Sequence, residues 1–220
     1  MRARRSDGTW AAPSDYNISV WSGFNETGAL NYRKNYTLFA PHDVPALIEF
    51  MGGNDAMAAF LDDIFDNGIY YVGDEFSMHA PYMYNLCGMP WKTQLRVYDI
   101  VNTYYLPQPS GLPGNDDCGQ LSAWYLFSAM GFYPMCPGST EYQLGIPCLP
   151  EIILHLPNGR DFRIVCENFG SGNCYVQSVT LNGKALERPA IEHADILRGG
   201  ELRFSVADTP SETCFTSKSR

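Results

Sequence analysis

The chain has 220 residues, of which 45% are hydrophobic and 18% charged, and its formal net charge is −9. This composition supports a packed core and excludes an intrinsically disordered protein. The acidic balance makes nucleic acid a poor partner, because phosphates would be repelled. No stretch reaches the roughly 20 consecutive apolar residues that a membrane-crossing helix needs, so we expect no membrane span.

The amino terminus and the sequons bear on the cellular location. The basic start at residues 1–5 is not followed by an apolar segment, so we expect no signal peptide in this chain. Three N-glycosylation sequons begin at Asn17, Asn25 and Asn35. Together with the cysteines, they favour a secreted or extracellular protein.

The chain contains seven cysteines, an odd number. Cys166 and Cys174 flank a turn-like segment and are expected to form a disulfide across a hairpin. Cys136 and Cys148 are a weaker candidate pair. No C-x-x-C motif occurs, which disfavours a zinc knuckle.

In chain order, the first part of the sequence reads as helices separated by long loops. Apolar residues at helical spacing and end signals predict helices over 42–51, 56–65 with Asn54 as N-cap, 91–105 and 122–130. The last of these is almost wholly apolar, which predicts a buried helix.

The second part reads as short strands. Apolar runs between turn signals predict strands over 152–156, 162–165, 175–181 and 202–206. Five or six such strands suggest a small antiparallel sheet. Pro137-Gly138 is the expected seam, so the fold class is α+β, with units at 1–136 and 137–210 and a tail at 211–220.

Two acidic, glycine-containing loops are the candidate functional segments. Gly114-Asn-Asp-Asp117 directly precedes the apolar helix, and Gly73-Asp-Glu75 precedes another helix-like run. Each is also a normal helix cap or turn, since Asp and Asn favour both positions. Carboxylates and amides are ligands for a hard cation such as calcium rather than zinc. Two carboxylates are also what glycoside hydrolysis needs.

Taken alone, the other candidate residues carry weaker signals. Glu26 reads as an ordinary surface glutamate, and Trp91 reads as a packed residue beside a capping Thr93. The residues by themselves therefore support a helix-rich domain with an acidic loop cluster and a small β region.

Several motifs together resemble glycoside hydrolase family 92, the calcium-dependent exo-α-mannosidases. They are Gly73-Asp-Glu-Phe-Ser-Met-His79, Pro90-Trp-Lys-Thr-Gln94, the long stretch Gly111–Pro134, and the tail segments Gln177–Lys184 and Leu197–Phe204. The resemblance runs over roughly residues 1–210. It implies the carboxyl-terminal portion of an (α/α)6 barrel followed by the small antiparallel β region. The family's amino-terminal β-sandwich and earlier barrel helices are missing.

The resemblance also implies roles for particular residues. Glu75 and Asp117 match calcium-ligand positions, and Asp117 also matches the general base. Glu26, in Phe24-Asn-Glu26, matches the general acid, although Thr27 and Leu30 depart from the usual glycine and tryptophan. The expected substrate-binding residues are Asn115, Trp91, Lys92 and His79.

The implied function is inverting, Ca²⁺-dependent removal of terminal α-linked mannose, α-1,2-linked, from mannosides or N-glycans. One alternative is an inactive fragment of such an enzyme. The other is a carbohydrate-binding remnant that binds sugars with its β region. Aromatic residues of that region lie mainly in apolar strand context, which disfavours this alternative. A chain of this kind needs the missing sandwich and barrel helices as partners.

Overall fold

The structure is a computed structural model that describes residues 6–9 and 30–215. Its α-helices are α1 (Leu30–Thr37), α2 (Val44–Phe50), α3 (Asn54–Asp66), α4 (Met83–Leu86), α5 (Pro90–Tyr104), α6 (Gln120–Ala129) and α7 (His193–Arg198), with short 3-10 helices η2 (Glu75–Ser77), η3 (Ala80–Tyr82) and η4 (Asp117–Gly119). Its strands are β1 (Phe132–Tyr133), β2 (Glu141–Leu144), β3 (Glu151–His155), β4 (Asp161–Glu167), β5 (Tyr175–Leu181), β6 (Lys184–Ala185), β7 (Ala190–Glu192) and β8 (Gly200–Ala207). In agreement with the sequence, the fold mixes helices with sheet.

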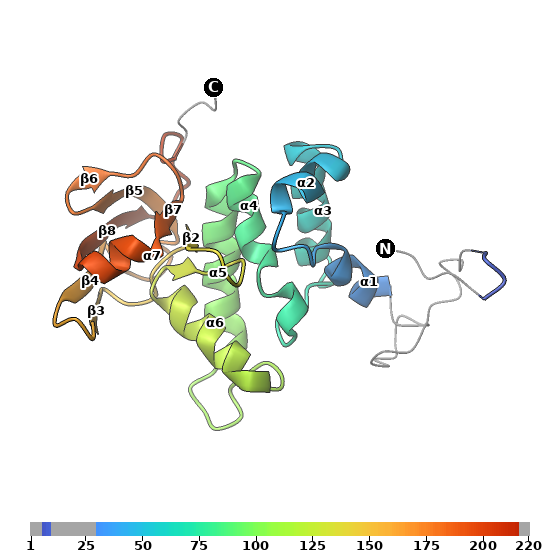
Figure 1. Cartoon of the computed structure of the whole chain (residues 1–220), viewed down its shortest axis with the longest axis horizontal. Helices are drawn as coiled ribbons and strands as arrows, with labels where there is room; N and C mark the ends of the chain where they lie inside the picture. The colour runs from blue at the N-terminus through green and yellow to red at the C-terminus, as the bar shows by residue number, and fades with distance from the viewer. Residues whose placement is uncertain (1–5, 10–29, 216–220) are drawn as a thin grey trace.

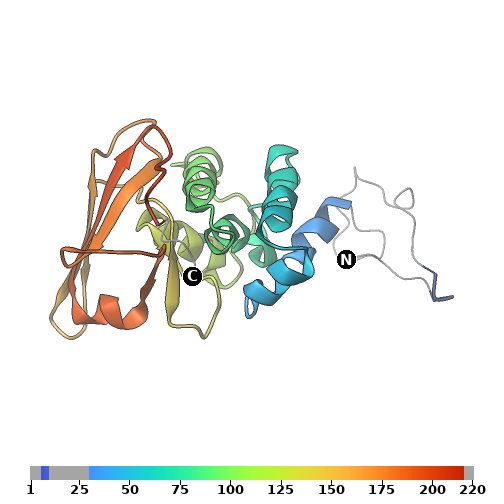
Figure 2. The same cartoon turned by 90° about the horizontal axis from the view of Figure 1, so that it is seen from above.

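Most helices lie apart from the sheets. Figures 1 and 2 show α1, α2 and α3 at one end, the sheets with α7 at the other, and α4, α5 and α6 between them. Within the described residues, no helix has the length and apolar character that crossing a membrane requires.

Local sequence explains where the first helices begin. Asp43 caps α2, since its side chain accepts a hydrogen bond from the Ala46 amide at 3.1 Å. Helix α3 starts at Asn54, the residue expected to be its cap, and Gly53 with φ 99° occupies the N-cap position instead. Its buried residues Met57, Leu61 and Ile64 recur at helical spacing, as expected.

Helix α5 packs against both hydrophobic cores, the one among the helices and the one between the sheets. Val97 and Ile100 are buried among the helices, whereas Leu95 and Tyr98 pack against the sheet core. The Gln94 side chain also links α5 to the sheet, because its Oε1 accepts a hydrogen bond from the Val176 amide of β5 at 2.9 Å.

Two sheets enclose the second core. Strands β1, β2 and β7 form one sheet, and the other has the order β3-β4-β8-β5-β6. Phe132 and Ile191 from the first sheet and Phe162 and Phe204 from the second share one hydrophobic cluster. The β3–β4 hairpin turns at Asn158-Gly159 and the β5–β6 hairpin at Asn182-Gly183.

The expectation of an antiparallel β region is wrong in one place. Strands β4 and β8 pair in parallel, with Phe162 opposite Gly200 and Glu167 opposite Ser205. The chain reaches this register through β7 and α7, which carry it back before β8 enters the sheet. In addition, β1 pairs with β2 across the expected seam at Pro137-Gly138.

The expected disulfides are also wrong, since all seven cysteines are free. Cys166 and Cys174 were expected to face each other across a hairpin, but β8 lies between β4 and β5. Both thiols are buried in the sheet core, and burial raises the pKa of Cys166 to about 11. Cys136 and Cys148 do not pair either.

One sequon is closed to glycosylation in the folded chain. Asn35 is 2% exposed, and its Nδ2 donates a hydrogen bond to the Ile69 carbonyl oxygen at 2.9 Å. A glycan needs this same nitrogen in solvent. Asn17 and Asn25 lie outside the described residues.

Candidate active site

The two acidic loops meet backbone to backbone. A Cβ atom on Gly114 would lie 2.5 Å from the Gly73 carbonyl oxygen, and one on Gly73 would lie 2.8 Å from the Pro113 oxygen. Glycine at both positions permits this approach. The contact joins the loop that precedes Glu75 to the loop that carries Asp117, although about forty residues separate them in sequence.

The glycine contact leads to a stability prediction. Gly114→Ala should lower the free energy of unfolding by about 1–3 kcal/mol, because the new methyl group would press on a backbone atom that has no side chain to move aside. Gly170→Ala is the matched control, since its nearest contacts would be 3.8 and 3.9 Å away. Urea denaturation measures both, and equal stabilities would contradict the close packing of the loops.

Neighbouring aspartates in the second loop have different surroundings. Asp116 accepts hydrogen bonds from the Ser122 amide at 3.0 Å and the Ser122 hydroxyl at 2.6 Å, and these bonds hold its pKa below the usual range. Asp116 therefore braces the start of α6. The exposed carboxylate of Asp117 has no hydrogen bond to any described side chain or amide. Asp117 is thus the member of the pair available to a ligand.

Glu75 borders a groove beside this loop pair. The groove has a volume of about 380 Å³, and its lining combines apolar side chains with a few polar ones: Phe39, Pro41, Glu75, His79, Gln120, Ala123, Phe127, Tyr133, Pro134, Met135 and Pro137. Two of the lining residues are bonded to each other, because Gln120 Nε2 donates a hydrogen bond to the Tyr133 hydroxyl at 3.2 Å. No hydrogen bond or ion pair of the Glu75 carboxylate is found within the described part of the chain.

His79 lies in the wall of the groove with a defined tautomer. Its Nε2 is 2.7 Å from the Leu38 carbonyl oxygen, which can only accept a hydrogen bond. Nε2 therefore carries the proton, and in the neutral ring Nδ1 is an acceptor. Burial lowers the pKa of His79, with the Leu38 bond as a smaller opposing effect.

The burial of His79 leads to a pH prediction. Because its pKa is lower in the folded chain than in the unfolded chain, the unfolded state takes up the proton first as the pH falls. The stability that His79 contributes is complete above its unfolded pKa of about 6.5 and is lost as the pH falls toward the folded value. His79→Gln should flatten the pH dependence of urea unfolding over this window. Identical slopes for the parent chain and His79→Gln would contradict the assignment.

A buried tryptophan joins helix α6 to the Glu75 loop. Trp124 is 0% exposed, its Nε1 donates to the Met78 carbonyl oxygen at 2.9 Å, and its ring stacks on Tyr105 at 5.7 Å. Met78 follows η2, which begins at Glu75. The position of Glu75 relative to α6 thus depends on this side chain.

The expected site residues do not all come together. Asn115 is exposed in the loop of Asp117, and His79 lines the groove with Glu75. Trp91 and Lys92 lie elsewhere: Trp91 lines a different cavity, and Lys92 Nζ pairs with Asp62 of α3 at 2.5 Å. Glu26 lies outside the described residues.

Sequence reasoning missed two polar residues of the groove. Gln120 and Tyr133 stand at the two ends of the apolar helix segment, where each reads as a helix boundary or a core residue. Both fall inside the Gly111–Pro134 stretch that carried the family resemblance, which was the available signal.

Comparison with known proteins identifies the family. The glycosyl hydrolase family 92 catalytic domain model matches residues 1–208, so the chain belongs to this family. A family 92 α-mannosidase structure from Bacteroides thetaiotaomicron is 35% identical over 96% of this chain and 28% of its own, with a TM-score of 0.82. An inverting mannosidase of the same family and species is 32% identical over 96% of this chain and 31% of its own, with a TM-score of 0.81.

A curated relative adds information on both length and location. An uncharacterized secreted glycosidase from Arthroderma benhamiae is 30% identical over 96% of this chain, which covers 28% of that protein. The chain therefore spans less than a third of the length of this curated relative and of the two structures above.

Proposed function

We propose that this chain supplies part of the active site of an enzyme that removes terminal α-linked mannose. The main support is the contact of Gly73 with Gly114, which holds the Glu75 and Asp117 loops together beside a groove. Both loops present carboxylates without partners among the described residues, and both belong to motifs that resemble the mannosidase family.

In this proposal the reaction inverts the anomeric centre. Asp117 accepts a proton from water as the water attacks the anomeric carbon on the face opposite the leaving oxygen. Glu26 donates a proton to that departing oxygen. An inverting pair needs about 6.5–9.5 Å between the carboxyl groups to leave space for the water.

The acidic loops suit calcium in donor type. The Glu75 and Asp117 carboxylates and the amide oxygen of Asn115 are hard oxygen donors, which Ca²⁺ prefers to the nitrogen and sulfur ligands typical of zinc. Ca²⁺ also tolerates an irregular arrangement of such donors, whereas Mg²⁺ demands a nearly octahedral one. Residues 6–9 and 30–215 contain no cluster of three His, Cys, Asp or Glu side chains able to hold a metal. Carbonyl oxygens, water and the remainder of a longer enzyme would therefore complete the coordination. When bound, calcium would hold sugar hydroxyls and help distort the ring.

The helices are proposed to be the carboxyl-terminal portion of an (α/α)6 barrel, in a unit over 1–136 that precedes a β unit over 137–210 and a tail over 211–220. The apolar composition of α6 predicts a buried helix, but Tyr125 is 38% and Leu126 60% exposed. Tyr104 at the end of α5 and Leu106 and Leu112 on the connection to α6 are also exposed. In this proposal, barrel helices or a sandwich outside this chain would cover these five apolar side chains.

The substrate is proposed to be an α-1,2-linked mannoside or an N-glycan, and the enzyme is proposed to act outside the cell. The description of the Arthroderma relative as secreted supports the location. Because the chain covers so little of its relatives, an inactive fragment is the alternative for the isolated chain.

Mannose release tests the proposal. The test protein is a chimera in which this chain replaces the matching segment of the Bacteroides α-mannosidase. We expect the chimera to hydrolyse α-1,2-mannobiose, a chelator to stop it, added calcium to restore it, and the isolated chain to release none. A folded chimera that stays inactive with calcium would contradict the proposal.

A further inference from the structure

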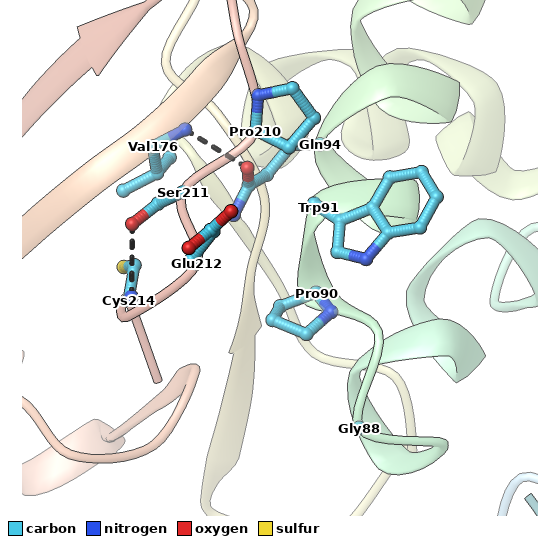
Figure 3. A pocket seen from close by; sticks show the side chains of 9 residues that line it. All are labelled: Gly88, Pro90, Trp91, Gln94, Val176, Pro210, Ser211, Glu212 and Cys214. Carbon is cyan, nitrogen blue, oxygen red and sulfur yellow. Dashed lines mark hydrogen bonds between the residues drawn. The ribbon is translucent and has the colours of Figure 1, made fainter. Parts of the chain in front are cut away.

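A second cavity lies apart from the groove of Glu75. Its volume is about 570 Å³, and it opens between the start of α5 and the segment that follows β8 (Figure 3). The lining residues are Gly88, Pro90, Trp91, Gln94, Val176, Pro210, Ser211, Glu212 and Cys214, none of which borders the groove.

The base of the cavity holds an amide donor that the fold leaves unused. Gln94 is only 3% exposed, and its orientation is fixed because Oε1 accepts from the Val176 amide at 2.9 Å. Nε2 consequently faces away from that bond, and it makes no hydrogen bond to any residue the structure describes. The Nε2 atom itself is not fully buried, so a ligand or water in the cavity can accept its hydrogen bond.

The opposite wall supplies acceptors and a further donor. Figure 3 shows Glu212 on the segment that faces the start of α5, and its carboxylate makes no hydrogen bond within residues 6–9 and 30–215. The Ser211 hydroxyl oxygen accepts from the Cys214 amide at 3.0 Å, so its own proton remains to be donated.

Trp91 and Pro90 give the helix side of the cavity an apolar surface. Trp91 is 36% exposed, and Lys92 Nζ lies 5.3 Å from the centroid of its ring. This cation–π contact restrains an aromatic ring that the core does not bury.

We propose that this cavity binds a neutral hexopyranose unit as a site separate from catalysis. Sugars combine vicinal hydroxyls, which fit the Glu212 acceptors and the Gln94 donor, with an apolar ring face, which fits Trp91 and Pro90. The negative charge of Glu212 would repel an anionic ligand. A purely apolar ligand would remove water from the Gln94 amide and the Glu212 carboxylate without offering either a hydrogen bond. The proposal holds whether or not the chain takes part in hydrolysis.

The test is a titration of the ¹⁵N-labelled 220-residue chain with methyl α-mannoside, followed by NMR. The indole N–H signal of Trp91, assigned from a Trp91→Phe sample, and the side-chain amide signal of Gln94 should shift together in a saturable manner. Cyclohexanol, which has a six-membered ring with a single hydroxyl, should shift neither.

Variants separate this cavity from the groove. Glu212→Gln keeps the shape and removes the charge, so the affinity should fall about tenfold. Glu75→Gln should leave it unchanged. Absence of saturable shifts at Trp91 and Gln94, or shifts that survive Glu212→Gln and vanish in Glu75→Gln, would overturn the proposal.

Discussion

Asp117→Asn in the chimera should lower the rate of mannoside hydrolysis by about 10²- to 10⁴-fold, the contribution typical of a general base. The amide is close in size to the carboxylate but cannot accept a proton from the attacking water. Since Asp117 is exposed and carries no structural hydrogen bond among the described residues, the melting temperature should hardly change. The measurement is kcat on α-1,2-mannobiose at saturating calcium.

Asp116→Asn is the matched control for this prediction. It makes the same chemical change at the adjacent residue, and asparagine replaces aspartate well at a helix start. The Ser122 amide would still find an acceptor, so kcat should stay within a few-fold of the parent chimera. A loss of activity in Asp116→Asn with full activity in Asp117→Asn would reverse the two roles and remove Asp117 as the base.

Trp124→Ala should cost about 3–5 kcal/mol of unfolding free energy, as other deletions of buried aromatic side chains do. It removes a fully buried ring, the stack on Tyr105 and the donor to the Met78 carbonyl oxygen. A single domain is stable by about 5–15 kcal/mol in total, so the loss is a large share of the whole. Urea denaturation followed by circular dichroism measures it.

Leu126→Ala provides the comparison for Trp124, two residues away on the same helix. Leu126 is 60% exposed, so its truncation in the isolated chain should change the unfolding free energy by no more than about 0.5 kcal/mol. Equal losses of unfolding free energy in the two variants would show that the face of α6 that carries Trp124 is not the face packed in the core.

The sequence predicted local elements well because their signals are local. Apolar spacing located α2, α3 and α5, and apolar runs between turn signals located β3, β4, β5 and β8. The parallel pairing of β4 with β8 escaped prediction, because it depends on how β7 and α7 carry the chain back to the sheet. The exposure of Leu126 escaped it as well, because the apolar composition of α6 is that of a buried helix, and composition alone does not show which side chains the fold leaves in solvent.

The candidate site was predictable only in part, for a similar reason. Motifs point to Glu75 and Asp117 as candidates, but no local pattern reveals that Gly73 and Gly114 touch. Trp91 and Lys92 belong to a motif with the same family resemblance, yet neither lines the groove. Trp91 lines a different cavity, and Lys92 forms an ion pair with Asp62 of α3. Membership in a motif therefore does not place a side chain in the groove, which Glu75 and His79 line.

The anomeric configuration of the first mannose released by the chimera tests most directly whether this chain supplies an inverting base. Proton NMR during the first turnovers separates the two anomers before they interconvert. We predict that β-mannose appears first from an α-mannoside and that Asp117→Asn slows its release by about 10²- to 10⁴-fold. Initial release of α-mannose, or unchanged release of β-mannose by Asp117→Asn, would contradict the account.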